Sequence, residues 1–266
     1  MPVRIVQSKH NPRLKELKRA LEHAGRDGKA GLEGPNLVRE AARAGLRIDT
    51  VFAADDQAAL LDELKLGPET EVLLAPRAVL SQVLMTETPQ PVAALVEPRQ
   101  WQWNDVLEGH GVLLVVVLAG LQDPGNVGTI LRSAEAFGAN GVISLPGTVS
   151  IWNPKTVRAS AGSVLRVPVV VADERVALER LKTAGVTTLA TAVQGAHTAT
   201  KTDLRRAVAL IIGNEGNGVP EQLAARADGA ITIPCPGPVE SLNAAVAASV
   251  LLYEAARQRG GIGGAQ

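Results

Sequence analysis

The stretch VLLVVVLAGLQDPGNVGTILRSAEAFGANGVISL, residues 112–145, contains the pattern that decides the fold. A continuous apolar run over 112–119 leads into a loop, a helical pattern over 127–137 and a second strand-like run over 141–145. A strand without polar alternation is typical of a sheet that is covered on both faces. The stretch therefore predicts a strand–helix–strand unit within a parallel sheet.

The same alternation continues towards the C-terminus. Further strands are expected at 167–171, 187–192, 207–213 and 230–234, and further helices at 176–184, 220–227 and 242–257. Because ligands bind at the carboxyl ends of the strands in such sheets, we expect the functional residues in the loops that follow them.

The residues before 98 carry a separate, smaller α/β pattern. Helices are expected at 11–23, 37–44, 57–66 and 76–85, and strands at 50–54, 71–74 and 92–96. Residues 98–110 are polar and interrupted by proline, which is typical of a linker. Trp101 and Trp103 within it are expected to pack between the domains, or alternatively to stack on bases. The predicted organisation is a domain at 1–97, a linker at 98–110 and a larger domain at 111–266.

Composition excludes several classes of protein. The chain has 266 residues, of which 27 are Lys or Arg and 27 are Asp or Glu, and 46% are hydrophobic, which is enough for a core and argues against disorder. Its single cysteine, Cys235, cannot form an internal disulfide, and no Cys/His cluster has the spacing of a metal site, so we expect a cytoplasmic protein without a metal. No apolar run is long enough to span a membrane, and no secretory signal opens the sequence.

Basic residues dominate the start of the chain. Up to residue 30 there are eight Lys or Arg and three Asp or Glu, although the whole chain is neutral. Such an excess can bind phosphate, and it can equally be the solvated face of a helix.

The loop that follows 112–119 turns through Asp-Pro-Gly at 123–125 and enters a helix. Asn126 is placed to cap that helix. Arg132 lies within the helix among apolar residues, where a guanidinium can bind a phosphate or carboxylate through two hydrogen bonds. The alternative is an arginine that only extends to solvent.

The sequence IIGNEGNG, residues 211–218, joins a buried strand to a helix and resembles a dinucleotide-binding turn. Its glycine spacing is GxxGxG, however, and Glu215 inside the loop would repel a pyrophosphate. The loop is better suited to a ligand with an amine, ribose hydroxyls or a cation, and Glu215 can also satisfy N–H groups of its own loop. A nucleotide-dependent oxidoreductase remains the rival enzyme class.

The third loop, at 234–240, has three prolines and precedes the helix expected at 242–257. Ser241 is expected to cap this helix, and Asn243 in its first turn is expected to have another hydrogen-bonding role. Because the helix is small and apolar, it should pack against the core or against a second copy of the chain. Cys235 is interpreted as structural.

Three segments taken together resemble the motifs of the SpoU (TrmH-like) RNA ribose 2′-O-methyltransferases of the SPOUT superfamily. They are DPGNVGTILRSAEAFGANGV (123–142), LIIGNEGNGVP (210–220) and ITIPCPGPVESLNAAVAASVLLYEA (231–255). NPKTVRASAGSVLRVPV (153–169) resembles the family's segment between the first two motifs, and SKHNPRLKELKRAL (8–21) with GLEGPNLVREAARAG (31–45) resembles its accessory RNA-binding domain. Cys235 departs from the family, which usually has a larger apolar residue there.

The resemblance implies an α/β fold whose C-terminal parallel-sheet domain contains a deep trefoil knot, preceded by a smaller α/β sandwich domain that binds RNA. It also implies a homodimer joined through the C-terminal domain, with S-adenosylmethionine as cofactor. Cofactor contacts carry over to Thr191, Ala192, Gly213, Asn214, Gly216, Ile233 and Leu242.

The implied reaction transfers a methyl group to a ribose 2′-hydroxyl of structured RNA, with large-subunit ribosomal RNA expected first and tRNA second. Arg132 is expected to bind the neighbouring phosphate or the developing oxyanion. Asn126, Glu215, Ser241 and Asn243 are expected to complete the catalytic site. Lys15, Arg19, Lys155 and Arg158, together with Arg166, are the expected RNA contacts. A non-catalytic RNA-binding module is the alternative from another class.

Overall fold

The computed structural model describes residues 3–22, 28–64, 66–86, 88, 90–109, 111–193, 196–239 and 241–260, except for the side chains of 58–60. The contacts divide the chain into two compact units. Unit 1 comprises Met1–Gln100 and Ser150–Leu165, and unit 2 comprises Trp101–Val149 and Arg166–Gln266. The sequence assigned 150–165 to the larger domain, whereas the contacts group this segment with unit 1, where its helix packs against a strand.

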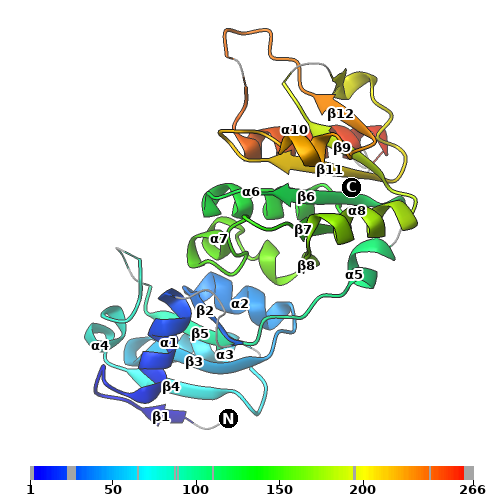
Figure 1. The fold of residues 1–266 in the computed structure, drawn as a ribbon. Coiled ribbons are helices and arrows are strands. Elements are labelled where there is room, and N and C mark those ends of the chain that lie inside the picture. Colours follow the sequence, from blue (N-terminus) through cyan, green and yellow to red (C-terminus); the bar gives the residue numbers. More distant parts are fainter. Residues whose placement is uncertain are drawn as a thin grey trace. The chain divides into compact units, whose positions relative to one another are not determined.

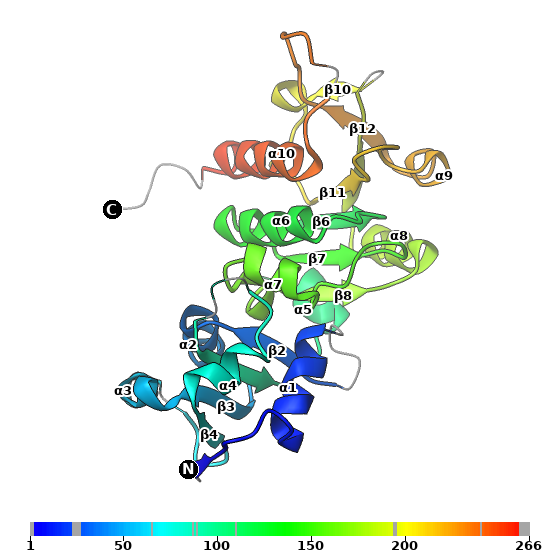
Figure 2. The same ribbon diagram turned by 90° about the vertical axis from the view of Figure 1, so that its left-hand side faces the viewer.

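Unit 2 is built on the expected parallel sheet (Figures 1 and 2). Its strands are β6 (Leu114–Ala119), β7 (Gly141–Ser144), β8 (Val169–Val171), β9 (Thr187–Thr191), β10 (His197–Thr198), β11 (Val208–Gly213) and β12 (Gly229–Thr232). They pair in parallel in the order β10-β12-β9-β11-β6-β7-β8. Only the two-residue edge strand β10 was not expected from the sequence.

Helices cover both faces of this sheet. They are α5 (Trp103–Leu107), α6 (Pro124–Ala136), α8 (Glu174–Thr183), α9 (Glu221–Ala224) and α10 (Ala244–Gln258), with a 3₁₀ turn at Ala199–Lys201. The two views place α6 and α10 together on one face, with α5 and α8 on the other (Figures 1 and 2).

The segment expected to be a linker contains α5. Val106 of this helix is fully buried in the core between the sheet and α8. Trp101 and Trp103 pack against the same core, and the guanidinium of Arg180 lies 5.9 Å from the ring centroid of Trp103. Both tryptophans therefore contribute to the core of unit 2.

Unit 1 contains a mixed five-stranded sheet. Its strands are β1 (Val3–Ile5), β2 (Ala30–Glu33), β3 (Ile48–Ala54), β4 (Glu71–Ala75) and β5 (Val92–Val96), in the order β1-β4-β3-β5-β2. Its helices are α1 (Pro12–Glu22), α2 (Pro35–Arg43), α3 (Ala58–Glu63), α4 (Arg77–Ser81) and α7 (Pro154–Ala159), with 3₁₀ turns at Asp55–Gln57 and Ser163–Leu165. Leu14, Leu17 and Leu21 bury one side of α1 against the sheet, as their helical spacing predicted.

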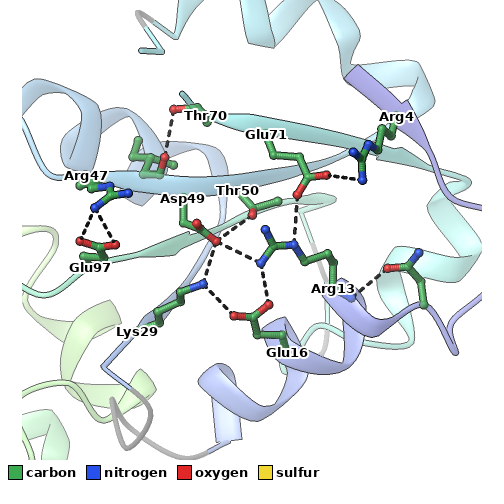
Figure 3. Close-up of polar contacts among 12 residues, drawn as sticks. Arg4, Arg13, Glu16, Lys29, Arg47, Asp49, Thr50, Thr70, Glu71 and Glu97 are labelled. Atoms are coloured by element: carbon green, nitrogen blue, oxygen red, sulfur yellow. Dashed lines mark hydrogen bonds and ion pairs between the residues drawn. The ribbon is translucent and has the colours of Figure 1, made fainter. Parts of the chain in front are cut away.

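An ion-pair cluster joins α1 to the sheet of unit 1 (Figure 3). The ammonium of Lys29 lies 2.8 Å from a carboxylate oxygen of Glu16 and 2.9 Å from one of Asp49. The guanidinium of Arg13 contacts Glu16 at 2.8 Å and Glu71 at 3.0 Å. Arg4 also lies 3.2 Å from Glu71, so three cations are shared among three carboxylates. Much of the basic excess at the start of the chain is therefore neutralised within the unit.

This cluster shifts the pKa of its members. Burial alone would raise the pKa of Glu16, but hydrogen bonds from Lys29 and Arg13 outweigh burial and lower that pKa. Burial would likewise raise the pKa of Asp49, and hydrogen bonds from Lys29 and Thr50 lower it. Because both carboxyl pKa values are lower in the folded state, their contribution to stability is present above their ordinary values of 4.5 and 3.8 and is lost as the pH falls through the folded values.

Replacement of Lys29 by methionine tests this cluster. We expect Lys29→Met to lower the free energy of unfolding of unit 1 by about 1 kcal/mol at pH 7, and to reduce the further loss between about pH 5 and pH 3. Urea denaturation at several pH values measures both effects. Lys18→Met is the matched control, since the ammonium of Lys18 lies 3.8 Å from Glu22 and its side chain is 53% exposed. Equal acid sensitivity of wild type and Lys29→Met would contradict the expectation.

Candidate active site

Four loops meet at one edge of the sheet of unit 2. β12, β9, β11 and β6 are consecutive neighbours and run in parallel, so their carboxyl ends lie side by side. This edge collects the ends of β9 and β11 and the segment after β12. It therefore includes six of the expected cofactor residues, which are Thr191, Ala192, Gly213, Asn214, Gly216 and Ile233. Leu242 lies two residues before α10.

The first of these loops enters α6 through Asp123. The side chain of Asp123 caps the helix by accepting a hydrogen bond from the backbone N–H of Gly125 at 2.7 Å, and Pro124 occupies the first turn. The prediction that Asn126 is the cap was wrong. Asn126 lies inside the first turn and is 9% exposed, so its amide is free for contacts across the sheet edge.

The third loop enters α10 through Asn243. The side-chain oxygen of Asn243 accepts hydrogen bonds from the backbone N–H groups of Ala245 at 2.9 Å and Val246 at 3.2 Å. The predicted cap, Ser241, precedes the helix by three residues and is exposed. The interpretation of Ser241 as the cap was therefore wrong, because Asn243 is the cap. The further hydrogen-bonding role expected for Asn243 is also present, since its amide nitrogen donates to Asn126.

A chain of side-chain hydrogen bonds joins all three motif segments. The amide nitrogen of Asn126 donates to a carboxylate oxygen of Glu215 in the second loop. The amide nitrogen of Asn243 donates to the amide oxygen of Asn126 at 3.1 Å. We call this chain of Glu215, Asn126 and Asn243 the Asn126 bridge. It connects the loop after β11, the first turn of α6 and the cap of α10.

The loop after β11 is closed by Asn214. Backbone hydrogen bonds run in both directions between Asn214 and Gly218, at 3.0 and 2.8 Å. The side chain of Asn214 accepts from the N–H of Gly216 at 2.8 Å and donates to the carbonyl of Gly120 at 3.0 Å. Asn214 thus has the loop-closing role that was an alternative for Glu215, and the Glu215 carboxylate accepts from Asn126 instead.

Gly213 lies where the chain passes very close to itself. A Cβ at this position would be 2.0 Å from the carbonyl carbon of Gly218 and 2.1 Å from the backbone nitrogen of Val219. These neighbours are backbone atoms and cannot rotate away. The turn therefore requires glycine at position 213.

Arg132 is not part of the Asn126 bridge. Six residues separate it from Asn126, which puts it about 9 Å further along α6 and about 120° around the helix axis. Its side chain is exposed, and no partner for it is found among the described residues. The structure thus brings Asn126, Glu215 and Asn243 together, and leaves Arg132 and Ser241 outside this hydrogen-bonded group.

Sequence reasoning missed a second link between α6 and α10. The hydroxyls of Ser133 and Ser249 are 2.7 Å apart, and Ser249 also bonds the carbonyl of Ala245 at 2.7 Å. Phe137 and Tyr253 then meet edge to face, with ring centroids 5.9 Å apart. Serines within otherwise apolar helices are the signal that could have indicated this pairing.

The expected RNA contacts fall into two groups. Lys15 and Arg19 lie on α1, Lys155 and Arg158 lie on α7, and all four are exposed residues of unit 1. Both helices pack against β2. Arg166, by contrast, belongs to unit 2 and binds the carboxylate of Glu135 through two nitrogens, one at 3.0 Å.

Neither a cluster of metal ligands nor a membrane-spanning helix is found within the described ranges. No cluster of three or more His, Cys, Asp or Glu side chains there could hold a metal ion. No helix of the same ranges has the length and apolar character needed to cross a bilayer. The Sγ of Cys235 lies 3.6 Å from the carbonyl oxygen of Ile233, within its own loop.

The close passage at Gly213 gives a direct test of the site's architecture. We expect Gly213→Ala to destabilise unit 2 by about 3 kcal/mol or more, because the new methyl group overlaps backbone atoms. Gly237→Ala is the matched control, since a Cβ there meets no heavy atom within 4 Å. Thermal and urea unfolding measure both variants. A Gly213→Ala protein as stable as Gly237→Ala would show that this turn is not as tight as described.

Comparisons with known proteins match both parts of the chain to family models. Residues 113–253 match the model of the SpoU rRNA Methylase family, and residues 32–102 match that of the RNA 2′-O ribose methyltransferase substrate binding domain. The 23S rRNA (guanosine(2553)-2′-O)-methyltransferase RlmP of Bacillus subtilis is 34% identical over 222 residues, which cover 84% of this chain and 86% of that one.

Solved structures show the same relationship. The AdoMet-bound rRNA methyltransferase from Sinorhizobium meliloti superimposes with a TM-score of 0.85 at 32% identity, over 96% of this chain and 98% of that chain. A structure concerned with the 2-OH methylation of C/U34 on tRNA matches with a TM-score of 0.52 at 33% identity, over 98% of its own chain but 56% of this one. The two family models and the full-length relatives show that the chain belongs to the SpoU rRNA methylase family.

Proposed function

We propose that the protein transfers the methyl group of S-adenosylmethionine to a ribose 2′-hydroxyl of large-subunit ribosomal RNA. The observation that carries this proposal is the Asn126 bridge, which ties the three motif segments of a SpoU methyltransferase into one group at the carboxyl edge of the sheet. A non-catalytic RNA-binding module would not need these three residues to meet.

The carboxyl edge suits the cofactor. Its second loop turns closely at Gly213 and Asn214, and Glu215 adds a negative charge. When bound, S-adenosylmethionine supplies a methyl group already activated by a cationic sulfur. The residues that would hold it are Thr191, Ala192, Gly213, Asn214, Gly216, Ile233 and Leu242.

Arg132 is the residue proposed to act on the substrate. A ribose hydroxyl is a poor nucleophile, so the protein must align it with the methyl group and stabilise the developing oxyanion. The exposed guanidinium can donate two parallel hydrogen bonds to that oxyanion or to the adjacent phosphate. Because a guanidinium stays protonated, we assign the proton to another acceptor, such as the substrate phosphate.

The Asn126 bridge positions the loops around that chemistry. Asn126 uses its amide oxygen and one amide hydrogen within the bridge, so it acts mainly by fixing Glu215 and Asn243. Glu215 holds the second loop, and Asn243 holds the start of α10. Ser241, exposed just before that helix, is proposed to border the target ribose together with Asn243.

The share of this chain that known proteins match favours ribosomal RNA over tRNA as the substrate. Relatives that act on or are described for rRNA match nearly the whole chain, including unit 1, whereas the tRNA-related structure matches only 56% of it. Unit 1 presents Lys15, Arg19, Lys155 and Arg158 on two helices, and these cations are proposed to bind the RNA backbone. An RNA substrate and a single cysteine support a cytoplasmic location.

The family relationship supports a trefoil knot in unit 2, as the resemblance of the three motif segments implies. The close passage at Gly213 is a separate, local feature, because Asn214 and Gly218 pair with each other across the same turn.

An exposed apolar stripe on α10 supports a homodimer. Val246, Val250 and Tyr253 are 49%, 39% and 44% exposed and lie at spacings of four and three, which puts them on one side of the helix. Such a stripe is costly to leave in water. We propose that the same helix of a second copy covers it.

The proposed reaction predicts that Arg132→Lys loses methylation activity but not cofactor binding. Lysine keeps the charge but cannot form the paired hydrogen bonds, so we expect methylation to fall at least about 100-fold while cofactor binding is retained. Labelled cofactor with ribosomal subunits and tRNA measures the transfer, and mapping of 2′-O-methyl nucleotides identifies the position. Calorimetry measures cofactor binding.

Arg175→Lys, on the exposed surface of α8 in the same unit, is the matched control and should be unchanged. Substantial turnover by Arg132→Lys would remove Arg132 from the mechanism. Labelling of tRNA alone would replace rRNA as the substrate.

A charged substitution in the exposed apolar stripe of α10 tests the proposed dimer. We expect Val250→Asp to convert the protein to a monomer in analytical ultracentrifugation, because a carboxylate would be buried against the apolar face of the partner. Val171→Asp is the control, since Val171 is 75% exposed on the edge strand β8. A Val250→Asp protein that sediments like Val171→Asp would place the interface elsewhere.

A further inference from the structure

Unit 1 contains a cleft that the methyl transfer does not use. It has a volume of about 260 Å³ and lies between the end of β2, the start of α2 and the segment that follows α4. Its walls include Glu33, Asn36, Leu37, Thr86, Thr88 and Gln90.

Glu33 forms the closed side of this cleft. It is only 7% exposed, although carboxylates are rarely buried without several partners. Its carboxylate accepts hydrogen bonds from the backbone N–H groups of Met85 at 2.9 Å and Thr86 at 3.2 Å, and from the hydroxyl of Thr86. A carboxylate has about four acceptor positions, so one remains for a ligand.

The open side of the cleft carries neutral polar groups. The amide oxygen of Asn36 accepts from Arg39 at 3.1 Å, which leaves its amide hydrogens as donors. Thr88 and Gln90 are exposed, and no hydrogen bond of their side chains is found among the described residues. No lysine or arginine is among the described lining residues.

This lining selects the chemistry of the ligand. The buried carboxylate of Glu33 would repel a phosphate, and none of the described lining residues is a cation that offsets this repulsion. Arg39, which contacts Asn36, is itself paired with Glu63 at 2.9 Å. The Glu33 carboxylate favours instead a group that presents N–H donors and carries no negative charge. The volume is just below the range of about 300–1,000 Å³ that drug-sized ligands occupy, so it suits a single ring system.

We propose that this cleft receives one unpaired nucleobase of the RNA substrate, with an amino group directed at Glu33. That the ligand is RNA rests on the proposed function. Proteins that read RNA sequence do so mainly at unpaired bases, whose edges are free to form hydrogen bonds. Adenine, cytosine and guanine carry an exocyclic amino group and are favoured, whereas uracil has carbonyl oxygens there that Glu33 would repel.

Fluorescence anisotropy with the full-length protein tests the proposal. The probes are hairpin RNAs that differ only in one bulged nucleotide, together with the fully paired hairpin. We expect a bulged cytidine to bind more tightly than a bulged uridine. Thr88→Val and Gln90→Ala should each weaken binding of the bulged-cytidine hairpin about fivefold, the effect of one lost hydrogen bond, and leave the paired hairpin unchanged.

Gln7→Ala, an exposed amide of unit 1 outside the cleft, is the matched control. Two results would overturn the inference. In the first, Thr88→Val and Gln90→Ala bind the bulged hairpin as tightly as Gln7→Ala does. In the second, the two variants lose as much affinity for the paired hairpin as for the bulged one. Methylation of ribosomal RNA by the wild type is measured in parallel. Absence of methylation together with a bulge-specific loss would overturn the proposed reaction and still support the cleft.

Discussion

The side-chain amide of Asn126 is the constraint on which the arrangement of the site depends. It lies nearly buried in the first turn of α6, donates to Glu215 and accepts from Asn243. Only a group that donates and accepts at the same time can serve both partners. Aspartate at 126 would put two carboxylates in contact, and a hydroxyl would be too short to reach both loops. The residue type therefore follows from the two partners.

The bridge and two further side-chain contacts link α6 and α10 along their length. The pairs Asn126–Asn243, Ser133–Ser249 and Phe137–Tyr253 are separated by 117, 116 and 116 residues, a nearly constant offset along both helices. A constant offset means that the two helices run parallel and in register. Any shift of α10 therefore displaces Asn243 and the exposed stripe together. In the proposed dimer, the partner would act on the bridge through this helix.

Much of unit 2 could be predicted from the sequence, because buried parallel strands are apolar without interruption and the helices between them are amphipathic. The residues that cap the starts of the helices could not be predicted in this way. Asp123 and Asn126 are both good caps, as are Ser241 and Asn243. The choice depends on where each loop leaves the sheet, which is a tertiary property. The cleft at Glu33 could not be predicted from the sequence either. A single carboxylate in a short strand has no sequence pattern that indicates burial, because its burial depends on the chain segment around Met85 that folds against it.

The Asn126 bridge also bears on how the negative charge of Glu215 and the positive charge of Arg132 are kept apart. An arginine close to Glu215 would pair with it and neutralise both groups, but Arg132 lies about 120° around α6 from Asn126. Among the described residues, the hydrogen-bond partner of Glu215 is the amide of Asn126, which occupies one carboxylate oxygen without cancelling the charge. In the proposed reaction, Glu215 is therefore available to a cationic methyl donor and Arg132 to an anion of the substrate. In the proposed transfer from a sulfonium to a ribose oxygen beside a phosphate, the two side chains act on opposite charges, and their separation keeps them from pairing with each other.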